Sequence, residues 1–363
     1  MSMGHKPTVF VGMSGGVDSS VTAYVLKQQG YAVVGIFMKN WSGYLSTSQG
    51  QFRFPCQAQP DYEDAAAVAR QLDIPLYTFN FEEEYQKRVI DYFVTEIQAG
   101  RTPNPDIMCN KEIKFKIFLE KAQTLGADYI ATGHYARISQ DKDGMFHLSQ
   151  GTDSGKDQSY FLATLGQKEL SWSIFPLGAY QKEDVRAIAR EADLATAAKP
   201  DSQGICFVGD IDVNEFIQAF VPPQKGEIVN THGDVLGEHD GIQFFTVGQR
   251  RGLGIGGGMP YYVVATEQET NRVYVAPGMN PPELYQRHVV LTDLVYTREP
   301  IQTGKTYHAR LRHGGELVPC VASEERCEGE LRVEFDTPQR AITPGQYLVF
   351  YEGEEVRGSG VMN

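Results

Sequence analysis

Ser14-Gly15-Gly16-Val17-Asp18-Ser19-Ser20 is the stretch of sequence that decides the fold class. It follows an apolar run, Thr8–Met13, that predicts a buried strand, and it opens a helical pattern over Asp18–Gln28. The glycines let backbone N–H groups turn inward, and a helix N-terminus adds partial positive charge, so this turn can hold a phosphate. It is not a Walker A loop, because GxxxxGK[ST] is absent. The alternative is an ordinary strand–helix turn in which Asp18 is a cap.

Strand and helix patterns alternate over the first half of the chain. Strands separated by helix-length segments indicate βαβ units, and the right-handed crossover rule then gives an α/β fold with a doubly wound parallel sheet. Ligands of such sheets bind at the carboxyl ends of the strands, where Ser14–Asp18, Lys39 and Gly133-His134 fall. The further strands that we expect are Tyr31–Met38, Leu76–Phe79 and Asp128–Thr132, and the further helices are Asp61–Leu72, Phe81–Gln98, Asn110–Leu125, Gln158–Leu165 and Lys182–Asp193.

The second half of the chain has short β-rich runs and dense turn residues. Pro222-Pro223 and Pro281-Pro282 punctuate it. We therefore expect a nucleotide-binding domain over 1–220, a small β-rich domain over 221–283 and a C-terminal β-barrel or sandwich over 284–363. The expected strands are Glu227–Asn230, Phe244–Val247, Tyr261–Ala265, Arg272–Val275, Val289–Leu294, Thr306–Arg312, Leu331–Phe335 and Gln346–Tyr351.

The composition is that of a globular protein. Of 363 residues, 41% are hydrophobic and 22% are charged, and no apolar run approaches the length of a membrane span. Five widely spread cysteines without a CxxC pair argue against a disulfide framework or a zinc ribbon. The net charge of −13 excludes a broad basic coat for nucleic acid, although a local basic face is compatible with it. We expect a cytoplasmic protein with no membrane partner that is a monomer when free.

One cysteine stands where a thiol would be reactive. Cys109 follows the rigid Pro103-Asn104-Pro105 turn and precedes the expected helix Asn110–Leu125, with Lys111 and Lys114 close in sequence. A helix N-terminus and nearby lysines would lower the pKa of the Cys109 thiol.

The other cysteines divide into one candidate thiol and three that we expect to be structural or accessory. Cys206 lies in a segment too polar for a core strand. For any single cysteine the alternative is a small buried hydrophobe, which we expect for Cys320 and Cys327 in their β-rich runs. Cys56 belongs to a loop over 40–61 whose role the sequence does not indicate.

Seven motifs occur along the chain: Ser14–Ser19, Gly100–Phe115, Gly133-His134-Tyr135, Lys156–Phe161, Asp201–Phe207, Thr246–Gly254 and Thr343–Gln346. The first resembles the pyrophosphate (PP) loop of the N-type ATP pyrophosphatases. Together, and in this order, the seven resemble the tRNA-specific 2-thiouridylases of bacteria and organelles. The resemblance implies an adenine nucleotide alpha hydrolase-like domain and ATP-dependent 2-thiolation of the wobble uridine in tRNAs of the Lys, Glu and Gln type. It also implies Mg²⁺ placed by Asp18, with tRNA and a protein persulfide donor as partners.

The resemblance also implies roles for particular residues. Cys206 would carry the persulfide, Cys109 would be the nucleophile paired with it, and Asp18 would serve the chemistry at the pyrophosphate. The ATP site would comprise Gly12, Met13, Ser14, Gly15, Gly16, Val17, Asp18, Ser19, Met38 and Gly133. Residues touching tRNA would be Asn104, Pro105, Asp106, His134, Lys156, Asp157, Gln158, Arg310, Arg312 and Gln346, of which the first three would face the target base.

Basic residues in several segments add a prediction about tRNA. Because side chains alternate along a strand, Arg310 and Arg312 would share one face of the expected strand Thr306–Arg312. With Arg250-Arg251 and the lysines beside Cys109, they would form an interrupted basic track. The alternatives are an ordinary solvated basic face and, for His134, a hydrogen-bonded structural histidine.

Three other functions are compatible with parts of the sequence. A small-molecule adenylating amidotransferase or ligase of the PP-loop superfamily would explain Ser14–Ser20 but not the two loop cysteines. A non-catalytic tRNA-binding protein would leave Asp18 and both cysteine motifs without a use. An iron–sulfur-dependent tRNA thiolase would use Cys109 and Cys206 as cluster ligands, but no third cysteine ligand is evident.

Overall fold

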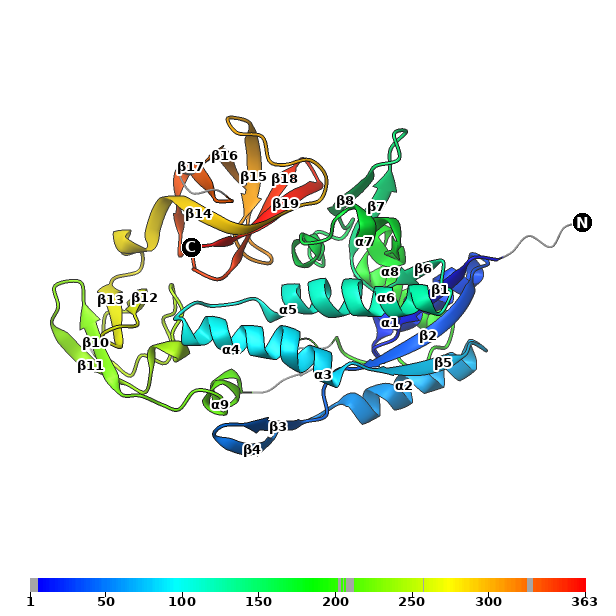
Figure 1. Cartoon of the computed structure of the whole chain (residues 1–363), viewed down its shortest axis with the longest axis horizontal. Helices are drawn as coiled ribbons and strands as arrows, with labels where there is room; N and C mark the ends of the chain where they lie inside the picture. The colour runs from blue at the N-terminus through cyan, green and yellow to red at the C-terminus, as the bar shows by residue number, and fades with distance from the viewer. Residues whose placement is uncertain (1–5, 202–203, 205, 207–211, 257, 325–328) are drawn as a thin grey trace, which may run out of the picture.

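The computed structural model describes residues 6–201, 204, 206, 212–256, 258–324 and 329–363 (Figure 1). The first half of the chain forms a parallel sheet with the strand order β5-β2-β1-β6-β9. The doubly wound α/β fold expected from the sequence is therefore confirmed. The strands are β1 (Thr8–Gly12), β2 (Ala32–Lys39), β5 (Leu76–Asn80), β6 (Tyr129–Ala131) and β9 (Ser173–Ile174).

Helices cover both faces of this sheet because alternate residues of its strands enter different cores. Val9 and Val11 of β1 pack with α1 (Val17–Gln28), α2 (Ala58–Gln71) and α8 (Lys182–Glu191). Phe10, which lies between them, belongs to the core on the other face. That face is covered by two long helices, each made of consecutive segments: α3 (Glu82–Tyr85), η1 (Gln86–Ile90) and α4 (Asp91–Gln98), then α5 (Pro105–Met108), η2 (Cys109–Ile117) and α6 (Phe118–Thr124).

The long helices differ from the prediction in two respects. The second begins at Pro105 rather than Asn110, because the Asn104 side chain caps it by accepting a hydrogen bond from the Ile107 N–H at 3.1 Å. Cys109 consequently lies inside the helix instead of preceding it. In addition, η1 and η2 are π-helical, a geometry that residue periodicity did not indicate.

The β-rich second half forms two units with cores of their own. The first is a four-stranded sheet, β11-β10-β13-β12, around Ile228, Val263 and Val273. The expected strand Phe244–Val247 is wrong, because a short 3₁₀ turn, η5 (Ile242–Phe244), occupies its start. The strands are β10 (Gly226–Asn230), β11 (Val235–His239), β12 (Tyr261–Glu267) and β13 (Arg272–Pro277).

The second unit is a closed barrel with the strand order β14-β17-β16-β15-β18-β19, in which β14 also pairs with β19. The closure decides between the barrel and the sandwich that the sequence left open. Its core contains Cys320, buried as expected, whereas Cys327 lies outside the described residues. The strands are β14 (Tyr285–Tyr296), β15 (Thr306–Arg310), β16 (Val318–Glu324), β17 (Leu331–Arg340), β18 (Tyr347–Glu352) and β19 (Glu355–Met362).

The barrel is joined to the α/β domain through a shared strand edge. A hairpin of β7 (Ala136–Gln140) and β8 (Phe146–Gln150) extends the barrel sheet, because β8 pairs with β19. Its short strands carried no clear sequence pattern. We propose domain boundaries near 220 and 283, on the basis of the separate cores. Within the described ranges, no helix is both long and apolar enough to cross a membrane.

The loop over 40–61 contains a second hairpin that the sequence did not indicate. Its strands are β3 (Tyr44–Thr47) and β4 (Gly50–Arg53). Trp41 and Phe54 beside it pack on Phe216 of α9 (Val213–Gln218), with ring centroids 6.1 and 5.4 Å apart. The loop is therefore a packed element that contacts α9.

Candidate active site

The glycine-rich turn has the geometry of an anion-binding loop. Gly15 has a φ of +73°, and a Cβ added there would lie 2.2 Å from the Asp61 carbonyl oxygen, so only glycine fits. Gly16 is the N-cap of α1, and none of the described side chains caps the helix there. The backbone N–H groups in the first turn of α1 are therefore free to donate hydrogen bonds to a phosphate, and Ser14 beside them is exposed.

The other predicted nucleotide residues lie against this turn. A Cβ at Gly12 would come within 2.9 Å of the Met38 Cε, and one at Gly133 would be 3.0 Å from the Asp18 Cβ. At Gly133 the neighbour is also the Asp18 backbone, so a side chain there would push the end of β6 from the loop, whereas at Gly12 the flexible end of Met38 could move aside. The structure brings together the full set: Gly12, Met13, Ser14, Gly15, Gly16, Val17, Asp18, Ser19, Met38 and Gly133.

Asp18 is held by partners that the sequence did not predict. Its carboxylate oxygens accept hydrogen bonds from the Lys182 Nζ at 2.7 and 2.8 Å, and Oδ1 also accepts one from the Tyr135 hydroxyl at 2.8 Å. Burial, with the Asp18 charge beside it, raises the pKa of Tyr135. Lys182 was missed because it is 164 residues away, at the start of α8.

Lys182 also connects the loop to the segment that leads to Cys206. Its Nζ lies 2.9 Å from the Asp201 Oδ1, and Lys156 and Arg186 bind the same carboxylate at 2.8 and 2.6 Å. Although burial opposes it, the hydrogen bonds from Lys156 and Lys182 lower the pKa of Asp201 to about 2. Asp201 is therefore a charged anchor for this segment.

The two predicted thiols are adjacent. The Cys109 Sγ donates to the Cys206 Sγ at 3.6 Å, although the residues are 97 positions apart. The Cys206 N–H donates to the Asp106 Oδ1 at 3.0 Å, and the Tyr85 hydroxyl donates to the Cys206 carbonyl at 2.7 Å. Side chains of both long helices thus fix the Cys206 backbone opposite Cys109.

The pKa values of the two thiols are shifted in opposite directions. Burial raises the pKa of the Cys109 thiol well above its usual range, and the hydrogen bond to Cys206 adds to that effect. The hydrogen bond from Cys109, together with the charge of Lys114, lowers the pKa of Cys206 against the effect of burial. The expectation of a lowered pKa at Cys109 is therefore wrong, because this residue is completely buried inside the helix and not at its N-terminus.

The C-terminal barrel holds the loop that precedes Cys109. The Gln346 Nε2 donates to the carbonyls of Thr102 and Pro103 at 2.8 and 3.1 Å, and its Oε1 accepts from the Asn104 Nδ2 at 3.4 Å. Asn104, Pro105 and Gln346 are thereby brought together beside the thiols.

The remaining residues predicted to touch tRNA do not form one surface. His134 is buried and its Nδ1 lies 2.7 Å from the Thr132 hydroxyl. Burial and the Lys114 charge lower the His134 pKa well below its usual range, so the ring is neutral, as in the structural alternative. Lys156 pairs with Asp201, and the Gln158 side chain accepts a hydrogen bond from the Tyr135 N–H at 3.1 Å.

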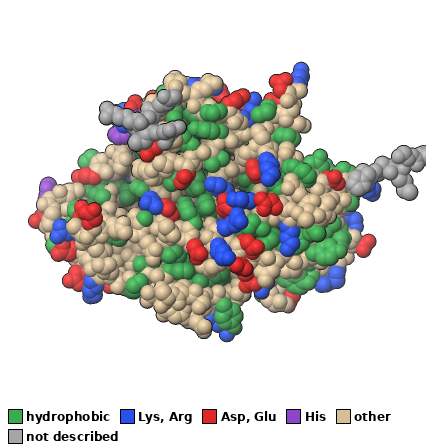
Figure 2. Space-filling model, viewed as in Figure 1, with side chains coloured by type: hydrophobic (Ala, Val, Ile, Leu, Met, Phe, Trp, Pro, Cys, Tyr) green, Lys and Arg blue, Asp and Glu red, His purple; other side chains and the backbone are tan. Residues whose placement is uncertain are grey.

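Arg310 and Arg312 also differ from the prediction. Strand β15 ends at Arg310, so Arg312 lies outside it and the two do not share a strand face. The Arg310 Nη1 lies 2.7 Å from the Asp157 Oδ2, and this pair is buried between the barrel and the α/β domain. Arg312 is exposed. On the face in Figure 2, lysines and arginines near the middle lie among acidic side chains. The interrupted basic track stays a prediction.

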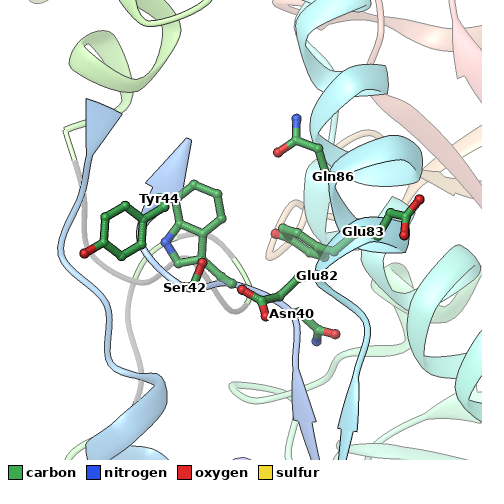
Figure 3. Close-up of a pocket in the computed structure, with 8 residues that line it drawn as sticks. Asn40, Ser42, Tyr44, Glu82, Glu83 and Gln86 are labelled. Atoms are coloured by element: carbon green, nitrogen blue, oxygen red, sulfur yellow. The ribbon is translucent and has the colours of Figure 1, made fainter. Parts of the chain in front are cut away.

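A cavity of about 240 Å³ lies between the loop over 40–61 and the first long helix (Figure 3). Tyr85 lines it and also binds the Cys206 carbonyl. Tyr44 from the loop over 40–61 stands opposite Gln86 and Glu83 of the first long helix, and Trp41 also lines the cavity. No sequence pattern indicated this cavity, because its walls come from segments distant in the chain.

Comparison with known families assigns the class of each part of the chain. Residues 7–210 match the tRNA methyl transferase HUP domain family, 214–277 the tRNA methyl transferase PRC-barrel domain family, and 286–362 the aminomethyltransferase beta-barrel domain family. A solved 4-thiouridine synthetase–RNA complex with bound ATP is 16% identical, with a TM-score of 0.36 over 58% of this chain and 50% of that chain.

Full-length relatives specify the family further. Proteins named tRNA-specific 2-thiouridylase MnmA from Enterococcus faecalis and Shouchella clausii are 47% and 50% identical. The matches cover 100% and 98% of this chain, and 97% and 96% of those proteins. The chain belongs to the tRNA-specific 2-thiouridylase family, as the sequence motifs predicted.

Proposed function

We propose that this protein catalyses ATP-dependent 2-thiolation of the wobble uridine in the anticodon of tRNA. The observation that carries the proposal is the thiol pair, 3.6 Å apart, in a chain that also has an anion-binding loop. Its relatives, matched over nearly their whole length, are named for this reaction. The matched domain families have names that refer to methyl transfer. We follow the relatives, because methyl transfer would give the thiol pair no use.

The first step uses the glycine-rich loop. The uridine O2 attacks the α-phosphate of ATP, pyrophosphate leaves, and C2 then carries an AMP leaving group. Ser14 and the first-turn N–H groups of α1 would hold the phosphates, and Lys182 adds positive charge beside Asp18. A small-molecule adenylating ligase would share this step but would not need the thiols.

Mg²⁺ would assist that step by neutralising phosphate charge. The candidate ligand is Asp18, whose carboxylate lies beside the loop and accepts from Lys182 and Tyr135. A carboxylate has further lone pairs, so it can add one metal bond to phosphate and water ligands. Among the described residues, no cluster of three His, Cys, Asp or Glu side chains suits a metal ion. A single carboxylate with phosphate oxygens is the form of site that fits.

The second step transfers sulfur from Cys206, loaded as a persulfide by a protein donor. In one route the outer sulfur attacks C2, AMP leaves, and the Cys109 thiol then gives up its proton as its sulfur attacks the Cys206 Sγ. The S–S bond breaks, and its electron pair stays on the transferred sulfur as the C=S group forms. In the other route Cys109 first releases hydrosulfide, which attacks C2. Both routes leave a Cys109–Cys206 disulfide, which a thiol reductant must reduce.

The tRNA would approach along the thiol side of the molecule. Asn104, Pro105 and Asp106 would face the target base, since they precede Cys109 on the same helix and Asp106 binds the Cys206 N–H. Exposed Arg312 is available to a phosphate, and Lys156, which is also exposed, would have to exchange its Asp201 partner for one. We assign Asp157 and Arg310 to domain docking, and His134 and Gln158 to support of the site. The protein would act in the cytoplasm and be a monomer when free.

The test is mass spectrometry of nucleosides from tRNA incubated with the protein, ATP, Mg²⁺ and a persulfide donor. We expect 2-thiouridine at the wobble position and AMP in equal amount. Thiolation without ATP, or AMP formation without thiolation of any tRNA, would reject the proposal.

A further inference from the structure

A lysine inside the second long helix is turned towards the thiol pair by the local helix geometry. In the π-helical segment η2 (Cys109–Ile117), hydrogen bonds connect residue i+5 with residue i, so Lys114 lies one turn beyond Cys109 on the same side. In an α-helix, with 3.6 residues per turn, the fifth residue would point about 140° away. The π-helix therefore places Lys114 where an α-helix would not.

Lys114 makes contacts that distinguish it from its neighbours. Its ammonium group donates a hydrogen bond to the Cys206 sulfur and also acts on Cys109 and Asp106 through its charge. Lys116, two residues on, points elsewhere and pairs with Glu112 at 2.8 Å. Lys114 therefore interacts with the thiols, unlike Lys116 of the same segment.

Polar and charged groups from several elements surround Cys206. Tyr85 and Asp106 hold its backbone, and Cys109 donates to its sulfur. Burial raises the pKa of both Tyr85 and Asp106, and Tyr85 stays protonated. The charge of His313, from the barrel, acts on Asp106, and burial lowers its own pKa. Lys114 is therefore the cation in direct contact with the Cys206 sulfur among the described groups.

We propose that Lys114 is a catalytic residue that holds the Cys206 sulfur as an anion while sulfur is loaded. This inference rests on the proposed function, since it names a further residue for the same chemistry. The Cys206 thiolate attacks the outer sulfur of a donor persulfide. The new S–S bond forms on Cys206, the donor S–S bond breaks, and the donor departs as a thiolate. Cys109, kept as a thiol by burial, does not compete for the donor.

The test is the pH dependence of Cys206 alkylation by iodoacetamide, followed at the Cys206 peptide by mass spectrometry. The full-length protein is used without tRNA or ATP. Because only the thiolate reacts, we expect a wild-type midpoint below the value of about 8.5 for a free thiol. Lys114→Met should raise the midpoint and slow alkylation at pH 7 about tenfold. Lys114→Arg should keep the wild-type midpoint, as should the control Lys116→Met.

Two results would overturn the proposal: an unshifted profile in Lys114→Met, or a wild-type midpoint at or above that of a free thiol. The wild-type midpoint is measured without any variant, so the proposal can be rejected even if Lys114→Met does not fold. Failure of the proposed function would look different. The wild-type protein would then form no 2-thiouridine, while the pH midpoint of Cys206 alkylation would still lie below that of a free thiol.

Discussion

The glycine-rich loop and the thiol pair are built in different ways, although both lie in one domain. The loop is one continuous stretch, Ser14–Ser20, whose backbone geometry follows from its own glycines and the helix that it opens, while distant Lys182 and Tyr135 hold only the Asp18 side chain. The thiol pair joins residues 97 positions apart and depends on Tyr85, Asp106 and a barrel residue, Gln346. A local site should tolerate damage elsewhere in the protein, whereas an assembled site should not.

The largest effect should come from the thiols themselves. Cys206→Ser should reduce thiolation by about a thousandfold or more and abolish persulfide labelling, because a covalent carrier is lost. Cys109→Ser should leave the labelling but stop thiolation, as measured by nucleoside mass spectrometry. Cys56→Ser is the control and should behave as wild type. Full thiolation by Cys206→Ser with a protein persulfide donor would contradict the assignment.

Removing the buried ion pair should damage the assembled site and spare the loop. Arg310→Ala leaves Asp157 buried without its partner, which costs about 3–5 kcal/mol. We expect a lower unfolding midpoint and slower Cys109–Cys206 disulfide formation under mild oxidation. ATP affinity, measured by calorimetry, should stay near wild type. If ATP affinity falls as much as disulfide formation, the two sites are not separable in this way.

Asp18→Asn should damage the glycine-rich loop and spare the thiol pair. Losing the carboxylate at the pyrophosphate should lower ATP turnover about a hundredfold, because fixed charge at the reacting phosphate is removed. The rate of Cys109–Cys206 disulfide formation should not change. The control is Asp73→Asn, at an exposed residue after α2. Unchanged pyrophosphate release in Asp18→Asn would refute the role of Asp18.

Gln346→Ala should weaken the assembled site by a smaller amount. It removes the side chain that holds Thr102, Pro103 and Asn104, at about 1 kcal/mol for each hydrogen bond lost. We expect thiolation to fall about tenfold or more with ATP turnover intact. Equal loss in both assays would mean that the barrel acts on the loop as well.

The smallest effect should come from Arg312→Ala, which touches neither site. If Arg312 contacts a tRNA phosphate, its loss should flatten the log–log salt dependence of tRNA binding by about 0.7–0.9. ATP affinity and the alkylation profile of Cys206 should be unchanged. A wild-type salt slope would show that Arg312 makes no phosphate contact.

The same contrast explains what the sequence could predict. The loop, the parallel sheet and both thiols were identified, because each depends on a contiguous pattern or a distinctive motif. Lys182 and Tyr85 were missed, since only the fold brings them to Asp18 and Cys206. The pairing of Arg310 with Asp157 joins residues 153 positions apart, and no periodicity reveals it. The acidity of the thiols was assigned to the wrong cysteine, because helix position and burial both had to be known.

The strand β19 has a consequence for how the protein is made. It pairs with β14 and β18 within the barrel and with β8 of the α/β domain, so it closes one unit and covers the edge of another. Of the described strands it is the last to leave the ribosome. Until then β8 and β14 have unpaired edges, which are templates for association with other nascent chains. Truncation before Glu355 would make that exposure permanent, and we expect it to yield aggregated protein rather than an active α/β domain.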